Sequence, residues 1–150
     1  MKASDNCLDL IKKSESFRPS PYLCPAGIPT IGYGSTRYAD GRAVKLTDPP
    51  ITEDQADEIM WATLGTYEDA VYRYVTVPIK QNHFDALVDF AYNAGAQNLR
   101  TSTLLKKLNQ GQYDQAANEF GKWVYGGGKK LGGLITRRGL ERDLFMATVV

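Results

Sequence analysis

Cysteine and histidine are scarce in this chain, which has two of the first and one of the second among 150 residues. Cys7 and Cys24 are too few for a disulfide scaffold and lack the C-x-x-C spacing of a structural zinc site. The single histidine, His83, makes no metal site and is expected to be a partly exposed packing residue on a helix. We therefore expect a fold held by its apolar core, with no metal and no cofactor.

The chain also lacks a strong charge of either sign and any long apolar run. Its formal net charge of +1 gives no general attraction to nucleic acid or to anionic membranes. No stretch reaches the roughly 18 consecutive apolar residues of a membrane span, and the first residues include no apolar segment of signal-peptide length. We expect no nucleic-acid partner and no stable membrane insertion, with the protein accumulating in the cytoplasm of the cell that makes it.

What remains is the composition of an ordinary globular protein. With 43% hydrophobic and 23% charged residues, the chain has the apolar content of a folded domain and the usual size of one. No internal repeat or low-complexity linker divides it. Residues 1–150 are therefore predicted to form a single domain.

Periodicity and turn residues predict an α+β architecture. A short amphipathic helix is expected from Asn6 to about Phe17, followed by a small antiparallel sheet within 20–44, where prolines and glycines separate β-prone residues. A capping-box pattern at 52–55 precedes a long helix that ends before Pro78. Further helices are predicted over 81–93, 102–110, 114–124 and 134–146. The expected molecule has two lobes, a small N-terminal lobe with the hairpin sheet and a larger helical C-terminal lobe, joined by the long helix.

One of the 17 acidic residues, Glu15, is predicted to lie near the end of the first helix, directly before the loop rich in proline and glycine. Such a position can place a carboxyl group at the mouth of a cleft, with Phe17 as an apolar neighbour. A general acid that protonates a glycosidic oxygen needs this kind of environment. By itself the position is weak evidence, because most acidic residues are solvated surface groups.

The segment 15–36 is more specific: it reads Glu-Ser-Phe-Arg-Pro-Ser-Pro-Tyr-Leu-Cys-Pro-Ala-Gly-Ile-Pro-Thr-Ile-Gly-Tyr-Gly-Ser-Thr. It resembles the phage-type lysozymes of glycoside hydrolase family 24, whose signature is Glu, eight residues, Asp or Cys, five residues and Thr, followed by Ile-Gly-Tyr-Gly. Both spacings match. Further blocks at 81–95, 102–105 and 133–141 continue the resemblance in the family's order, so that it covers most of the chain.

The resemblance implies that Glu15 is the general acid, that Cys24 occupies the water-activating position, and that the Thr30 hydroxyl helps to hold that water. An unperturbed thiol has a pKa of about 8.5 and is only a few per cent ionised at neutral pH, so Cys24 would be a weaker base than the Asp of many relatives. A buried structural cysteine is the alternative for Cys24. The alternative for Thr30 is a β-branched residue packed on a sheet.

Arg137 or Arg138 resembles the family's basic residue that approaches the catalytic glutamate from the last helix. Such an ion pair would lower the pKa of Glu15 and oppose the effect of burial. The alternative for both arginines is an exposed helix face.

The activity that the resemblance implies is that of an endolysin. This muramidase would hydrolyse the β-1,4 bond between N-acetylmuramic acid and N-acetylglucosamine in bacterial peptidoglycan, acting as a monomer and released to the wall through a separate holin. Two alternatives stay open. A lytic transglycosylase needs one acid/base glutamate and leaves 1,6-anhydro products lighter by one water, and a wall-binding module would have kept the fold without catalysis.

Overall fold

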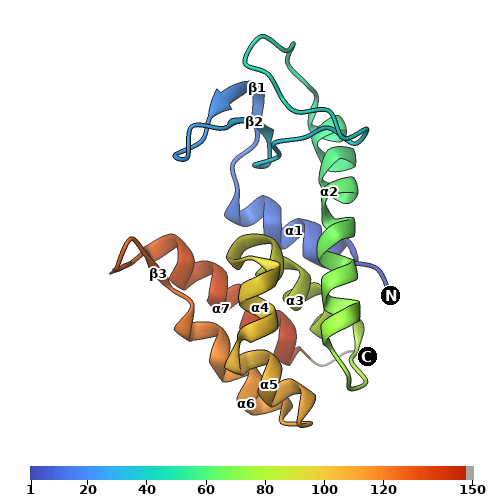
Figure 1. The fold of residues 1–150 in the computed structure, drawn as a ribbon, viewed down its shortest axis with the longest axis vertical. Helices are drawn as coiled ribbons and strands as arrows, with labels where there is room; N and C mark the ends of the chain where they lie inside the picture. Colours follow the sequence, from blue (N-terminus) through green and yellow to red (C-terminus); the bar gives the residue numbers. More distant parts are fainter. Residues whose placement is uncertain (148–150) are drawn as a thin grey trace. The chain divides into compact units, whose positions relative to one another are not determined.

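The computed structural model describes residues 1–147 and divides the chain into two compact units (Figure 1). The sheet unit is Ile11–Gly65, and the helical unit comprises Met1–Leu10 and Thr66–Val150. Two helices, α1 (Asp5–Ser14) and α2 (Glu53–Tyr74), contribute residues to both units. Within the described residues, seven α-helices accompany two small antiparallel sheets. The predicted α+β class is confirmed.

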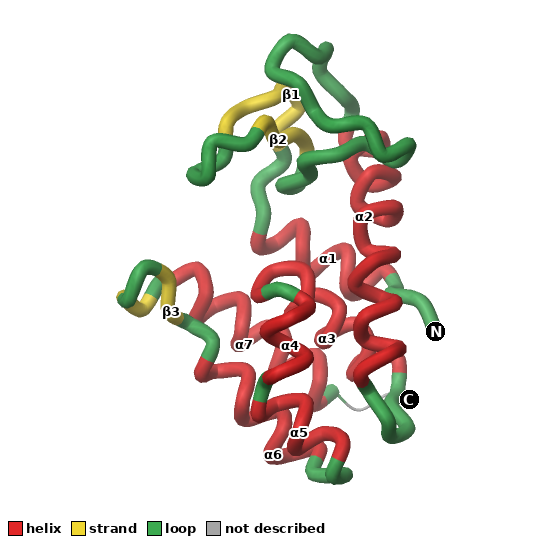
Figure 2. Tube along the Cα trace, in the orientation of Figure 1, coloured by secondary structure: helices red, strands yellow, loops and turns green. Residues whose placement is uncertain are grey.

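The sheet unit begins in the last turn of α1. It contains strands β1 (Arg18–Leu23) and β2 (Pro29–Gly32), which pair antiparallel (Figure 2). The first helix ends before the predicted limit at Phe17. Residues 15–17 connect the helix to β1, whose two prolines keep the residues before them in the extended region. The strands are also confined to 18–32, so the sheet is smaller than predicted.

The loop between β2 and α2 is held by local contacts. An isolated bridge between Arg37 and Ala43 closes the turn at Asp40 and Gly41. At the start of α2 the Thr52 N–H donates to Gln55 Oε1 at 2.8 Å, and the Gln55 N–H donates to Thr52 Oγ1 at 3.2 Å. The predicted capping box is confirmed.

The helical unit is built around α3, whose residues 84–91 are all buried and which packs against α7. Its elements are α3 (Gln81–Ala94), α4 (Ala96–Thr101), α5 (Thr103–Asn109), α6 (Tyr113–Glu119), the 3-10 turn η1 (Phe120–Lys122), β3 (Tyr125–Gly126), β4 (Lys129–Lys130) and α7 (Gly132–Met146). The sequence did not predict α4 or the β3–β4 hairpin, and α6 is shorter than the helix predicted over 114–124. No helix among the described residues is long and apolar enough to cross a membrane.

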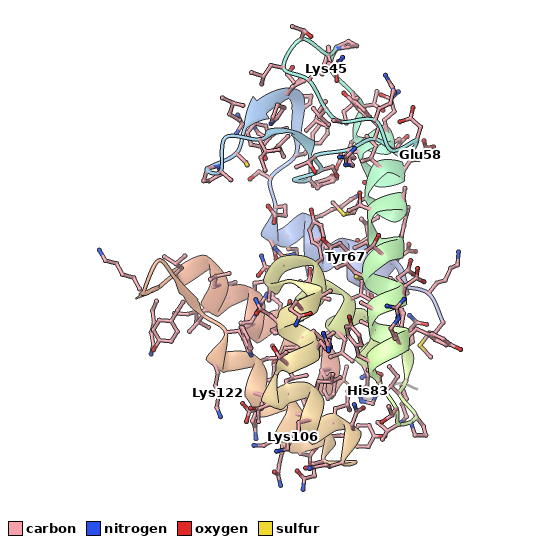
Figure 3. The ribbon with its side chains drawn as sticks, in the orientation of Figure 1. Lys45, Glu58, Tyr67, His83, Lys106 and Lys122 are labelled. Atoms are coloured by element: carbon pink, nitrogen blue, oxygen red, sulfur yellow. The ribbon has the colours of Figure 1, made fainter. Side chains whose placement is uncertain are left out.

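His83 is a packing residue, as predicted. It is half-buried, with its ring 4.6 Å from that of Phe145 and 5.4 Å from that of Tyr113, and Figure 3 shows it among the helices of this unit. Its Nδ1 accepts the Lys80 N–H at 3.0 Å. Burial, followed by the nearby Lys80 charge, lowers the pKa of His83, so the ring is kept neutral and able to accept this bond.

Buried charges join α3 to α7. Arg137 is 4% exposed and binds Asp89, which is 0% exposed, through two hydrogen bonds of 3.0 and 2.6 Å. Arg138 donates to Asn93 Oδ1 at 2.7 Å and to Glu141 Oε2 at 3.0 Å. Burial, and then a hydrogen bond shared with Asp89, raises the pKa of Glu141. The exposed-face alternative for the two arginines is therefore wrong, while an approach of either one to Glu15 stays a prediction.

Replacing Asp89 by Asn should destabilise the protein, because the buried Arg137 guanidinium would lose the carboxylate that accepts two of its hydrogen bonds. We expect the free energy of unfolding to fall by about 3 kcal/mol, measured by urea denaturation. Asp40→Asn is the control, since it breaks an exposed pair with Arg42 at 2.7 Å and should leave the urea midpoint unchanged. Equal midpoints for Asp89→Asn and the wild type would show that the buried pair contributes nothing.

Candidate active site

Glu15 directly follows the last residue of α1. Its N–H donates to the Ile11 carbonyl at 2.7 Å, which continues the hydrogen-bond pattern of the helix onto this residue. The side chain is half-buried. Just beyond it the Phe17 ring contacts that of Tyr33 with 5.6 Å between centroids. The chain around Glu15 is thus held by a helix end on one side and an aromatic contact on the other.

Tyr33, in the Ile-Gly-Tyr-Gly segment, anchors this region to α2. Its hydroxyl donates to Glu53 Oε1 at 2.6 Å, and the Lys12 ammonium lies 5.6 Å from its ring centroid. Lys12 also pairs with Asp57 at 2.9 Å. Burial, followed by the Glu53 carboxylate, raises the pKa of Tyr33, so the phenol remains a proton donor. One tyrosine therefore links the end of α1, the turn after β2 and the first turns of α2.

The turn after β2 requires glycine. Gly32 has a φ of 67°, and a Cβ at this position would lie 3.2 Å from the Ala56 Cβ on α2. A larger residue would be strained by its φ and crowded by the helix. Ile31 and Ser35 exchange backbone hydrogen bonds of 2.8 and 2.9 Å across the turn. The glycine thus allows β2 to contact α2 and the chain to reverse at once.

Cys24 and Thr30 flank the loop between β1 and β2. The Cys24 N–H donates to the Ile28 carbonyl at 3.0 Å, and the Gly27 N–H donates to the Cys24 carbonyl at 2.8 Å. The Thr30 hydroxyl donates to the same Ile28 carbonyl at 2.8 Å. Thr30 is 2% exposed and Cys24 is half-exposed. The loop therefore brings the two predicted site residues onto one backbone group.

The environment of Cys24 favours its thiolate. Hydrogen bonds lower the pKa of Cys24 below its ordinary value. The largest contribution comes from the Ile28 backbone and smaller ones come from Ala26 and the Thr30 hydroxyl, against the effect of desolvation. Because the Thr30 hydroxyl has one hydrogen, it can donate to the Ile28 carbonyl or to the sulfur, but not to both. Cys24 is only half-buried, so the buried state expected of a structural cysteine does not apply to it, while its water-activating role stays a prediction. The buried state describes Cys7, which is 0% exposed and whose pKa is raised, first by burial.

Tyr22 belongs to this site and was missed by the sequence analysis. It pairs directly with Thr30 across the sheet, and the Arg18 guanidinium lies 4.2 Å from its ring centroid. Burial raises the pKa of Tyr22 most, Arg18 lowers it, and the negative charges of Glu15 and Cys24 each raise it. The charges of Glu15 and Cys24 therefore both act on the Tyr22 phenol, and Tyr22 itself pairs with Thr30. Tyr22 can be identified as a site residue from the strand register, which the amino-acid composition does not reveal.

Among residues 1–147 no three His, Cys, Asp or Glu side chains are grouped as a metal site would require. The arrangement instead offers a carboxyl group, a thiol with a lowered pKa and a buried hydroxyl. A carboxylic acid can protonate a leaving oxygen, and a thiolate beside a hydroxyl can orient a water and take its proton.

Comparison with known proteins finds similar chains among phage endolysins. Residues 12–141 match the family described as Phage lysozyme. The endolysin of Salmonella phage P22 is 37% identical over 147 residues, which cover 98% of this chain and 99% of that protein. The endolysin of Bacillus phage B103 is 38% identical over 146 residues, and the chain spans only 54% of its length. Among solved structures, the endolysin from Escherichia coli O157:H7 phage FAHEc1 superposes with a TM-score of 0.89 at 38% identity, over 99% of this chain and 96% of that one.

The lowered pKa of Cys24 can be tested by alkylation. Iodoacetamide reacts with the thiolate, so the midpoint of the rate against pH should fall below the pKa of an unperturbed thiol in the folded wild type. Thr30→Val removes one donor to the sulfur, which makes the thiolate less stable and should move the midpoint upward. Mass spectrometry locates the adduct and checks that the buried Cys7 has not reacted. A midpoint that does not differ between Thr30→Val and the wild type would exclude a hydrogen bond from Thr30 to the thiolate.

Proposed function

Because the chain belongs to the phage lysozyme family, we propose that it is an endolysin, a muramidase that hydrolyses the β-1,4 bond between N-acetylmuramic acid and N-acetylglucosamine in bacterial peptidoglycan. The observation that carries this proposal is the hairpin register, in which Thr30 pairs with Tyr22 and shares the Ile28 carbonyl with Cys24, while the charge of Glu15 acts on the Tyr22 phenol. Glycoside hydrolysis needs an acid for the leaving oxygen and a water on the other face of the sugar.

Glu15 is the proposed general acid. Its carboxyl group donates its proton to the glycosidic oxygen as the bond to the anomeric carbon of muramic acid breaks, so that N-acetylglucosamine leaves with a neutral hydroxyl. Its place at the end of α1, with Phe17 fixed against Tyr33, limits the movement of the backbone that bears the acid. A fixed acid loses less entropy on reaching the reactive geometry.

Cys24 and Thr30 are the proposed holders of the water. When the Thr30 hydroxyl donates to Ile28, its oxygen keeps its lone pairs and can accept one hydrogen of a water. The Cys24 thiolate accepts the other hydrogen and takes the proton as the oxygen attacks the anomeric carbon from the face opposite Glu15. The product is a reducing muramic acid with inverted configuration. A transglycosylase needs no such water, so the Cys24 and Thr30 pair supports hydrolysis.

The remaining parts of the proposal concern the whole protein. The relatives act as endolysins, so peptidoglycan is the expected substrate and the cell wall the place of action. We propose that residues 1–150 work as one lysozyme domain, which is supported by the match to nearly the full length of the P22 endolysin. We also propose that the protein is a monomer held in the cytoplasm of the infected bacterium until a separate holin releases it.

Glu15→Gln should abolish lysis while leaving the fold intact, because the amide keeps the shape of the side chain but has no proton to transfer. Loss of a general acid typically costs 10²–10⁴-fold in rate, which turbidity assays on purified walls can follow, with the melting temperature as the check on folding. Near wild-type clearing by this variant would disprove the assignment. Mass spectrometry of the wild-type products decides the reaction, since predominantly 1,6-anhydro ends would contradict hydrolysis.

Substitutions at Cys24 should separate a water-activating role from a structural one. Cys24→Asp supplies a carboxylate in place of the thiolate and should remain active, whereas Cys24→Ala should lose much of its kcat with little change in KM. Thr30→Val keeps the shape and should likewise lower kcat more than it lowers the melting temperature. Full activity in Cys24→Ala would show that the water does not depend on position 24.

A further inference from the structure

The β3–β4 hairpin of the helical unit has no role in the proposed reaction. Figures 1 and 2 show it extending from the helices of this unit, in the chain that leads from η1 to α7. Tyr125 pairs with Lys130, and Gly126 pairs with Lys129. The turn between the strands consists of Gly127 and Gly128, with φ values of 59° and 80°. The tip of the hairpin therefore carries no side chain.

The two faces of this hairpin differ. Residues directly opposite each other in an antiparallel pair point to the same face, and neighbours along a strand point to opposite faces. Tyr125 and Lys130 therefore share one face, while Lys129 lies on the other. Tyr125 is 58% exposed, and both lysines are exposed. An aromatic ring and an ammonium group thus lie side by side in solvent.

Leu131 fixes the hairpin from its other face. Its N–H donates to the Val124 carbonyl at 2.9 Å, which extends the pairing by one step. Its Cδ1 lies 2.5 Å from the place that a Cβ on Gly126 would occupy, so the leucine fills the space that glycine leaves. The backbone that bears Tyr125 and Lys130 is therefore paired before any ligand arrives, so binding does not have to order it.

The charged residues of the hairpin and of the chain on either side of it are all of one sign. The segment from 120 to 140 contains no Asp or Glu. Lys122 points outward in Figure 3 and pairs with Glu119 at 2.9 Å. Arg137 and Arg138 are buried and pair with carboxylates. The exposed positive charge of the segment is therefore concentrated on Lys129 and Lys130, and it is complementary to an anionic ligand.

We propose that the Tyr125 and Lys130 face binds a carboxylate-bearing stretch of glycan in the wall polymer. A sugar ring packs on the Tyr125 ring, and a carboxylate attached to a muramic acid pairs with the Lys130 ammonium. That the ligand belongs to the wall polymer rests on the proposed function, whereas the pairing of a sugar ring with Tyr125 and of a carboxylate with Lys130 rests on the hairpin itself. An anionic lipid surface is the less suitable partner, because the glycine tip offers no apolar side chain for insertion.

Binding can be measured apart from cleavage. Full-length Glu15→Gln protein, labelled with ¹⁵N, is titrated with peptide-free muramic acid glycan strands, which carry free carboxylates, and separately with neutral N-acetylglucosamine oligomers. Lys130→Gln should weaken binding of the muramic strands about threefold and leave the neutral oligomers unaffected. Tyr125→Ala should weaken both by roughly fivefold, because it removes the surface on which the ring packs.

Lys129→Gln is the matched control, since it removes the same charge from the other face of the same strand. It should leave both affinities unchanged. Equal losses in Lys129→Gln and Lys130→Gln would overturn the proposal in favour of unspecific charge attraction, and so would wild-type affinity in both Tyr125→Ala and Lys130→Gln. Preferential binding of anionic phospholipid vesicles over the muramic strands would also overturn it, in favour of a membrane surface.

Kinetics give a second readout in the otherwise wild-type protein. Lys130→Gln should raise KM for walls with kcat unchanged, because the lost contact is equally present in the ground state and the transition state. A fall in kcat with KM unchanged would contradict a binding role. If the wild type releases no reducing ends and yet the hairpin still discriminates between the two glycans, the proposed hydrolysis fails while the binding face remains.

Discussion

The sheet unit depends on the hydrogen bond from the Tyr33 hydroxyl to Glu53. This single contact of 2.6 Å joins the turn after β2 to the first turn of α2, in a place where the tyrosine is shielded from water. The Tyr33 ring also supports Phe17, and Gly32 allows the close approach to Ala56. Tyr33 therefore contacts both the segment that follows Glu15 and the first turn of α2, directly after the strand that bears Thr30.

Local signals predicted the parts of the fold that depend on neighbours in sequence. The capping box of α2 was predicted from Thr52 and Gln55 because both halves of it lie within one turn. The hairpin of β3 and β4 was missed because two-residue strands leave no alternation, and three glycines predict only a break. The buried state of Arg137 and Arg138 was missed because their partners on α3 lie far away in sequence.

In the candidate site, too, the sequence predicted the residues but not the contacts that depend on distant parts of the chain. Glu15, Cys24 and Thr30 were predicted from spacing, through a family resemblance, and not from any property of the single residues. Their surroundings depend on strand register, which an irregularity between Arg18 and Tyr22 shifts. Counting along the sequence does not reveal this shift, so neither the pairing of Tyr22 with Thr30 nor the backbone contacts of Cys24 could be predicted.

Ile28 acts on Cys24 through its main chain, while its side chain is 48% exposed. An amide is the same in every residue except proline, which has no N–H to give. The largest contribution to the lowered pKa of the thiol therefore depends on the path of the backbone. A different side chain at position 28 can change the surface of the loop without altering the pKa of Cys24. A site of this kind leaves no trace of its strongest electrostatic contact in a sequence motif.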